Sequence, residues 1–213
     1  MKSGFPHHRF KGEEFGWSDE EESEWVWLVD PLDGTNNYAI GHPLYAVCIT
    51  CIYRGEPLLG VIYDSHLDNM YIAEKGNGVT CNGVPLRMKK REFRLPTFAW
   101  IQGHQVQKDP VAMQLKQHLD QVCKRVLRLW APALVWCMLA RGDIDGVLLY
   151  NSEGDDLYAG LLVAREAGAI TVDYNGNPFV GMKKEPYILA CHPDRKEEFL
   201  RLVYNGMAKN NRG

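Results

Sequence analysis

The chain has 213 residues, 46% of them hydrophobic, so it can fill one large core or two smaller ones. Its charges nearly balance, with 24 basic and 27 acidic side chains and a formal net charge of -3. The chain lacks the basic excess that would indicate a nucleic-acid partner, and no apolar run approaches the ~20 residues that cross a bilayer. The first residues lack the apolar centre of a signal peptide, so we expect a cytoplasmic enzyme or binding protein.

The first half of the chain predicts strands. Residues 1–24 are polar and are expected to form a loop, with an acidic run at residues 18–24. Strand-like segments follow in the order EWVWLVD, YAVCITCIY, LLGVIYD and NMYIAEK, and the turn signal RGEP joins the second to the third. A segment rich in turn glycines, GNGVTCNGVPL, comes next. This order predicts an antiparallel meander.

The second half predicts helices that alternate with strands. Apolar residues follow near-helical spacing through DPVAMQLKQHLDQVCKRVL, and APALVWCMLARGD predicts a buried helix that ends at a glycine. Residues 156–168 predict a third helix, and PDRKEEFLRLVYNGM predicts a last amphipathic one. The segments DGVLLY, AITVDY and PYILAC predict strands. Because the composition changes most at residues 95–110, we expect two halves, 1–99 and 100–213.

Six cysteines are scattered along the chain, and only Cys48 and Cys51 form a C-x-x-C pair. The pair lies in a predicted strand, where residues three apart point to opposite faces. No second pair completes a zinc site. We therefore expect buried thiols rather than a metal or redox pair.

The stretch WLVDPLDGTNNY places two aspartates, Asp30 and Asp33, at the end of an apolar strand. Pro31 disfavours the helical conformation at Asp30, and Gly34 allows a tight turn and the close approach of a ligand. The turn can direct both carboxylates and the carbonyl of Leu32 into one pocket, a set of oxygens that suits Mg²⁺. Turns with these letters also occur without any function, so the motif alone leaves both interpretations open.

Further groups could complete such a site. If Thr35 opens a helical turn, its N–H and that of the preceding glycine suit a phosphate. Glu13 and Glu14 lie upstream in KGEEF, and Asp155 and Asp156 open a predicted helix. An aspartate at a helix start is usually only a cap, so Asp155 and Asp156 indicate a metal site only together with the other acidic segments.

These motifs together resemble a known family. The segments GEE, WLVDPLDGTNNY, GNGVTCNGVPL and DDLYAGLLVAREAGA stand in the order and approximate spacing of the inositol monophosphatase family, from about Lys11 to the last helix. The resemblance implies a layered αβαβα sandwich of the α+β class, similar in fold to fructose-1,6-bisphosphatase. It implies a lithium-sensitive phosphatase with two or three Mg²⁺ ions, replaceable by Mn²⁺, acting as a homodimer on inositol monophosphate or a related sugar phosphate.

The resemblance also assigns the site residues. The implied metal ligands are Glu13, Asp30, Leu32 through its carbonyl, Asp33 and Asp156. The implied catalytic residues are Glu13 and Thr35, and the implied substrate-binding residues are Asp33, Gly34 and Thr35. Asp30 would bridge two metals, and Thr35 would orient the attacking water.

The sequence departs from the family pattern in several places. Two helices usually precede the Gly-Glu-Glu motif, cover one sheet and supply an acidic partner for the threonine, whereas Glu13 stands near the start here. Asp155 replaces a tryptophan, and Leu149 replaces a glutamate that contacts substrate. Trp130 stands near a Gly-Ser pair of the family and is expected to pack at a helix entry. The alternatives are nucleotide 3'-phosphatase or fructose-1,6-bisphosphatase activity, or a shortened non-catalytic relative that acts as a dimer partner.

Overall fold

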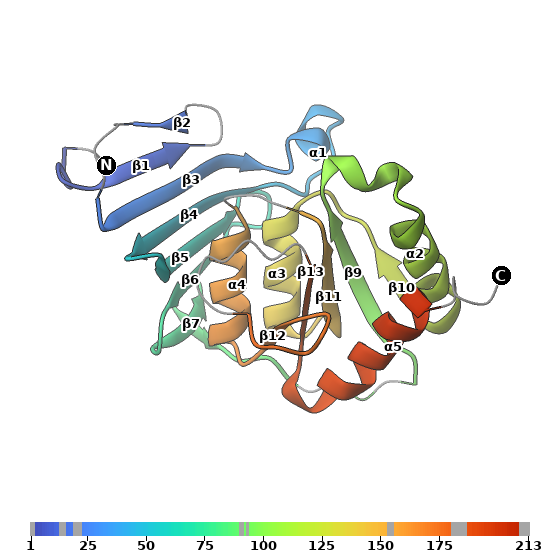
Figure 1. Ribbon diagram of the computed structural model, residues 1–213. Helices are drawn as coiled ribbons and strands as arrows, with labels where there is room; N and C mark the ends of the chain where they lie inside the picture. Colours follow the sequence, from blue (N-terminus) through green and yellow to red (C-terminus); the bar gives the residue numbers. More distant parts are fainter. Residues whose placement is uncertain are drawn as a thin grey trace.

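The computed structural model shows two β-sheets with helices between and beside them (Figure 1). It describes residues 3–12, 16–18, 23–89, 92, 94–152, 156–179 and 187–208. Two helices lie between the sheets, and two more cover the far face of the second sheet (Figure 1). The described layers are therefore sheet, helices, sheet and helices, which matches the predicted αβαβα sandwich without its first helical layer. No helix of the described part is long and apolar enough to cross a membrane.

The first sheet has the strand order β2-β1-β3-β4-β5-β6-β7-β8. Its strands are β1 (Arg9–Gly12), β2 (Gly16–Trp17), β3 (Trp25–Asp33), β4 (Ala46–Tyr53), β5 (Glu56–Asp64), β6 (Asn69–Glu74), β7 (Gly78–Cys81) and β8 (Val84–Leu86). From β3 onward each strand pairs antiparallel with the next, which confirms the meander. The expected loop at residues 1–24 is wrong for β1 and β2, because β1 pairs in parallel with β3 despite its polar sequence.

The second sheet has the order β10-β9-β11-β13-β12. Its strands are β9 (Thr97–Gln102), β10 (Arg125–Leu127), β11 (Gly146–Tyr150), β12 (Ile170–Asp173) and β13 (Tyr187–Cys191). The chain thus passes from one sheet to the other between Leu86 and Thr97, and the division into domains at 1–99 and 100–213 stays a prediction. The segment KRVL does not continue the preceding helix as predicted. It pairs in parallel with β9, and this tertiary pairing overrides the helical spacing.

The four longer helices begin close to their predicted starts. They are α1 (Thr35–Ala39), α2 (Pro110–Val122), α3 (Pro132–Arg141), α4 (Asp156–Glu166) and α5 (Lys196–Ala208), with short 3₁₀ turns at His104–Lys108 and Pro193–Arg195. Asp109 caps α2, since its side chain accepts the N–H groups of Val111 and Ala112. α3 ends before Gly142, which has a φ of 78° and confirms the predicted helix stop.

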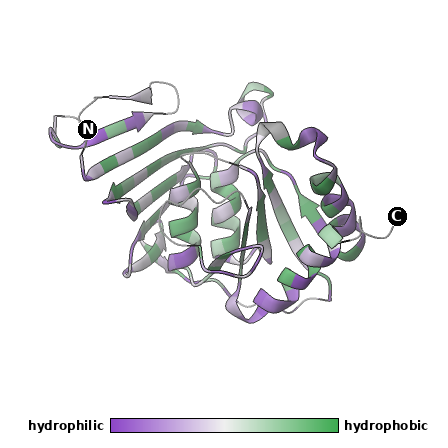
Figure 2. Ribbon diagram, viewed as in Figure 1, coloured by the Kyte–Doolittle hydropathy of each residue, from purple (hydrophilic) through white to green (hydrophobic). Residues whose placement is uncertain are grey.

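The core between the sheets forms where glycines allow close approach. A Cβ at Gly160 of α4 would lie 2.1 Å from the Trp136 ring of α3, so the helices touch only because that atom is missing. Gly60 of β5 likewise admits Ala159 of α4, with the new Cβ at 3.1 Å. Figure 2 shows hydrophobic residues concentrated on these helices and on the strands that face them. This packing holds α4 against β3, β4 and β5.

The other face of the first sheet, here called the outer face, is also apolar. Its residues are Val29, Val47, Ile49, Val61, Tyr63, Met70 and Ile72. Near the N-terminus His8 stacks on Trp25 and Phe5 contacts Trp27 with its ring tilted by 39°. The Trp27 indole donates to His8 Nδ1 at 2.8 Å. Elsewhere on the outer face no described element lies above the strands, and Ile72 is 39% exposed. β3 is therefore apolar on both faces, as predicted.

Candidate active site

The DPLD segment ends strand β3 in a bulge. Asp30 pairs with Cys48 and Asp33 pairs with Ala46, so three steps along β3 match two steps along β4. Residues three apart on a regular strand point to opposite faces, but the extra residue of a bulge returns them to the same face. Asp30 and Asp33 consequently share the face of the core residues Ala46 and Cys48, where they are 6% and 5% exposed. The bulge is what brings the two carboxylates together.

Backbone N–H groups hold both carboxylates in place. Asp30 Oδ1 accepts the N–H of Leu32 at 2.9 Å, within the turn itself. Asp33 Oδ2 accepts the N–H of Ala133 at 2.9 Å, from the first turn of α3. A helix N-terminus carries partial positive charge, so α3 favours the ionised form of Asp33.

Gly34 and Thr35 make the turn that follows. Gly34 has a φ of 91°, and a Cβ there would lie 2.8 Å from the Leu44 carbonyl oxygen, so only glycine fits. Thr35 is the first residue of α1, and its exposed hydroxyl donates to the Leu32 carbonyl at 3.0 Å. The hydroxyl oxygen at Thr35 keeps acceptor capacity toward a water.

Asn37 ties this turn to the rest of the site. Its side-chain amide donates to the carbonyls of Leu44 at 2.8 Å and Leu129 at 2.6 Å, and the residue is 3% exposed. The β3–α1 turn, the entry to β4 and the segment before α3 therefore meet at one place. Asn37 was not predicted as a site residue, although it follows the threonine of the motif by only two residues.

The described donors fit a hard cation. Asp30 and Asp33 supply buried carboxylates and Leu32 a carbonyl, which are the oxygens that Mg²⁺ takes in proteins. Glu13 lies outside the described residues, and Asp156 is described only by its backbone, as the first residue of α4. Their roles stay predictions. Within the described ranges, no group of three or more acidic, histidine or cysteine side chains gathers that could hold a metal ion.

A third buried carboxylate was not predicted. Asp64 ends β5 and is 4% exposed, and its Oδ1 accepts the N–H groups of His66 and Leu67 at 3.1 Å each. The register aligns it with Asp33 through Ala46 of the intervening strand. Burial, helped by the charges of Asp64 and Asp33 and opposed by Arg141, raises the pKa of the Cys137 thiol well above its usual value. Without a bound metal, the Cys137 thiol is therefore protonated at neutral pH.

Trp130 corrects one expectation from the sequence. It was expected to pack at the entry of a helix, but it is 64% exposed and has a φ of 52°. Cys48 faces the helices and Cys51 lies on the opposite face of the sheet, and both thiols are buried, as predicted.

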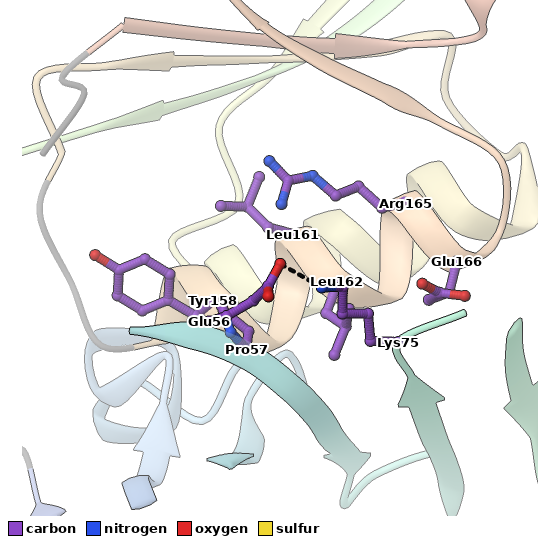
Figure 3. A pocket seen from close by; sticks show the side chains of 8 residues that line it. All are labelled: Glu56, Pro57, Lys75, Tyr158, Leu161, Leu162, Arg165 and Glu166. Carbon is purple, nitrogen blue, oxygen red and sulfur yellow. Dashed lines mark ion pairs between the residues drawn. The ribbon is translucent and has the colours of Figure 1, made fainter. Parts of the chain in front are cut away.

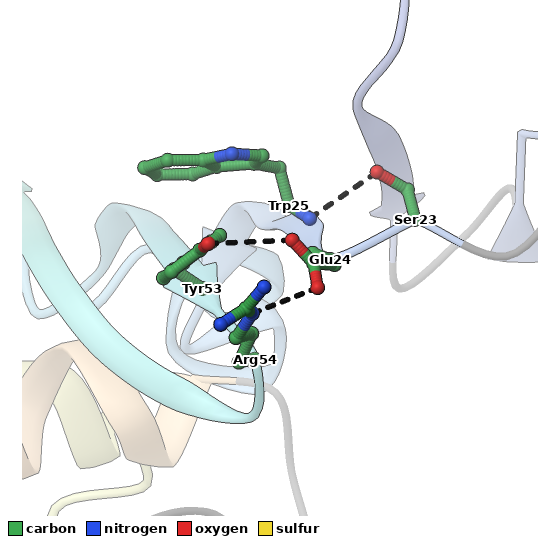
Figure 4. A network of polar contacts seen from close by, with 5 residues as sticks. All are labelled: Ser23, Glu24, Trp25, Tyr53 and Arg54. Atoms are coloured by element: carbon green, nitrogen blue, oxygen red, sulfur yellow. Dashed lines mark hydrogen bonds and ion pairs between the residues drawn. The ribbon is translucent and has the colours of Figure 1, made fainter.

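Two further polar groupings are structural. A cavity of about 190 Å³ lies between β5 and α4 (Figure 3), and its charged side chains already have partners. Lys75 pairs with Glu56, and the Glu166 carboxylate accepts the N–H groups of Gly76 and Gly78. Arg165 donates to the Thr171 hydroxyl at 2.7 Å and to the Phe179 carbonyl. At the start of β3, Glu24 accepts from Arg54 at 2.7 Å and from the Tyr53 hydroxyl at 3.3 Å (Figure 4). The Arg54 hydrogen bond lowers the pKa of Glu24. Neither grouping involves the Asp30–Asp33 turn.

Comparisons with known proteins agree with this geometry. The sequence model of the inositol monophosphatase family matches residues 1–208. The chain is 30% identical over 206 residues to the putative Nus factor SuhB of Neisseria meningitidis serogroup A, covering 95% of this chain and 78% of that protein. It is 33% identical over 178 residues to the fructose-1,6-bisphosphatase/inositol-1-monophosphatase of Aquifex aeolicus, covering 82% of this chain and 66% of that protein.

A solved structure gives the same result for the fold. The inositol monophosphatase from Anabaena (Nostoc) sp. PCC 7120 superposes with a TM-score of 0.86 at 28% identity, covering 96% of this chain and 81% of that one. The two sheets and their helices thus have the inositol monophosphatase and fructose-1,6-bisphosphatase type of fold. From its motifs, its fold and the match over residues 1–208, the chain belongs to the inositol monophosphatase family.

Proposed function

We propose that this chain hydrolyses a small phosphate monoester, such as inositol monophosphate or a related sugar phosphate, in a Mg²⁺-dependent reaction. The family consists of phosphomonoester hydrolases that typically depend on Mg²⁺. The observation that carries the proposal is the bulge that puts Asp30 and Asp33 on one buried face, beside the exposed hydroxyl of Thr35. The name of the Aquifex relative supports fructose-1,6-bisphosphate as an alternative substrate.

The proposed roles follow from the contacts. Asp30, Asp33 and the Leu32 carbonyl would hold the metal, and Glu13 and Asp156 would join them by the family resemblance. When bound, Mg²⁺ supplies charge neutralisation and a lowered pKa of water. Without a cation, the two carboxylates would repel a phosphate dianion, so the order of binding is metal and then substrate.

Thr35 would position the attacking water. Because its hydroxyl hydrogen is donated to the Leu32 carbonyl, its oxygen can accept a hydrogen bond from that water. A carbonyl takes no proton, so this pair orients the water without acting as a general base. Glu13 is the carboxylate that we propose for proton transfer. The N–H groups of Gly34 and Thr35 would bind the phosphate oxygens.

The test is phosphate release from a panel of monoesters, with Mg²⁺ and with the metal chelated. We expect Asp30→Asn to lower kcat/KM by about 100-fold or more, since it removes a charge at the metal. Asp120→Asn is the control, because Asp120 is an exposed residue that pairs only with Arg128 in the described contacts. Absence of Mg²⁺-dependent release from every ester by the wild-type chain would refute the proposal.

A second candidate function is a dimer partner without catalysis. The outer face of the first sheet favours it, because Met70 and Ile72 there are 42% and 39% exposed. An apolar face of this kind is typical of an interaction surface. Sedimentation velocity of the wild type and of Ile72→Lys tests it: a dimer that Ile72→Lys separates supports this role, and a monomeric wild type refutes it.

A further inference from the structure

Trp130 combines two features that core packing does not explain. The residue is 64% exposed, although it is one of the largest apolar side chains. Its backbone has a φ of 52°, in the left-handed region that bulky residues rarely adopt. Among the described residues no aromatic ring or cation stacks on the indole. Strained residues of this kind concentrate at functional sites, so the feature calls for a functional explanation.

The neighbours of Trp130 place it at the rim of the candidate active site. The carbonyl of Leu129, one residue earlier, accepts the Asn37 amide from α1 at 2.6 Å. The N–H of Ala133, three residues later, donates to the Asp33 carboxylate at 2.9 Å. Consecutive Cα atoms are about 3.8 Å apart, so Trp130 lies within ~11 Å of the Ala133 Cα. The strained residue thus lies between two anchors that both belong to the site.

Two apolar side chains close to Asn37 in the sequence are exposed as well. On the α1 side of the Asn37 contact, Tyr38 is 58% and Ile40 is 69% exposed. Tyr38 contacts Tyr45 edge to face, with ring centroids 5.2 Å apart. Trp130 would then lie within reach of the alcohol part of an ester whose phosphate binds at the proposed metal site and at the N–H groups of Gly34 and Thr35.

Resting on the proposed phosphatase function, we propose that Trp130 is a stacking surface for the alcohol part of the substrate. It selects phosphate monoesters that carry a flat unsaturated ring, such as an aryl group or a nucleoside base. An exposed indole offers a π-face to such a ring whatever its hydrogen-bonding pattern. Removing one stacking ring typically weakens binding about 5- to 150-fold. An ester of glycerol has no ring and gains nothing from the indole.

The experiment compares 1-naphthyl phosphate with glycerol 2-phosphate in the presence of Mg²⁺. Trp130→Asn removes the indole, and asparagine tolerates the left-handed backbone better than most residues. We expect kcat/KM for naphthyl phosphate to fall about tenfold or more, through KM, while that for glycerol phosphate stays unchanged. Tyr204→Ala is the control, because it removes another aromatic side chain, 71% exposed, on α5. It should leave both substrates unchanged.

Two outcomes would overturn the inference. An equal loss on both substrates would mean that Trp130 acts through the backbone or a subunit contact, and sedimentation velocity would identify the latter. If neither substrate is hydrolysed, the proposed function fails, and calorimetric titration with phenylphosphonate and methylphosphonate then decides the inference. Tighter binding of phenylphosphonate that Trp130→Asn abolishes supports stacking, whereas equal binding of the two by the wild type refutes it.

Discussion

The turn after Asp33 provides a sharp test of how the site is built. A Cβ at Gly34 would lie 2.8 Å from the Leu44 carbonyl oxygen and 3.2 Å from the Tyr45 Cα, both of them backbone atoms that cannot rotate away. Gly34→Ala therefore combines the strain of a left-handed φ of 91° with a steric clash. Gly41 has a similar φ of 75°, but a Cβ there meets nothing within 4 Å. Gly41→Ala thus carries the strain alone.

The magnitudes follow from these two contributions. A left-handed residue other than glycine costs roughly 1–2 kcal/mol, and overpacking adds about 1–3 kcal/mol. We expect Gly41→Ala to lower the free energy of unfolding by about 1 kcal/mol and Gly34→Ala by about 2–5 kcal/mol. Urea unfolding measures both, and Mg²⁺ titration reports whether the turn still holds its ligands. Equal stability of the two variants would show that β4 does not confine Gly34.

Three other predictions concern the same fold. Asn37→Ala leaves the carbonyls of Leu44 and Leu129 without their hydrogen-bond donor, so we expect the free energy of unfolding in urea to fall by about 1–3 kcal/mol. An unchanged unfolding midpoint would contradict the proposal that Asn37 holds these segments together. Asp156→Asn should abolish phosphate release while Asp155→Asn has a mild effect. The reverse pattern would show that Asp155, not Asp156, is the metal ligand at the start of α4. Burial raises the pKa of Cys191 from 9.0 to about 12, so the unfolded thiol ionises first and stability should fall as pH rises from 9 toward 12. Cys191→Ala should lessen that fall, and an identical pH dependence in the variant would refute this account.

Local chemistry explains the elements that the sequence predicts. The end of α3 at Gly142 was predicted, and the cap of α2 at Asp109 was not. Both depend only on residues that are neighbours in the sequence. The segment KRVL and strand β1 were not predicted as strands. Their partners, β9 and β3, lie elsewhere in the chain, and hydrogen bonds to those partners outweigh local propensity.

The candidate site divides in the same way. The sequence by itself determined the turn that carries the proposed donors Asp30, Leu32 and Asp33, because a proline and a glycine around acidic residues restrict the local backbone. Alternation along a strand would have placed the two aspartates on opposite faces. Only the pairing of β3 with β4, in which three steps along β3 match two along β4, puts both carboxylates on the buried face.

Tertiary structure alone decided the surroundings of those donors. Asp64 aligns with Asp33 through strand register, and Ala133 reaches Asp33 from a helix one hundred residues away. Trp130 is a large apolar residue of the kind usually found in the core, yet its side chain is exposed, because exposure depends on which segments pack around a residue. Turns and caps are read from neighbours in sequence, whereas faces, registers and exposure arise from contacts between distant segments, which no local pattern encodes.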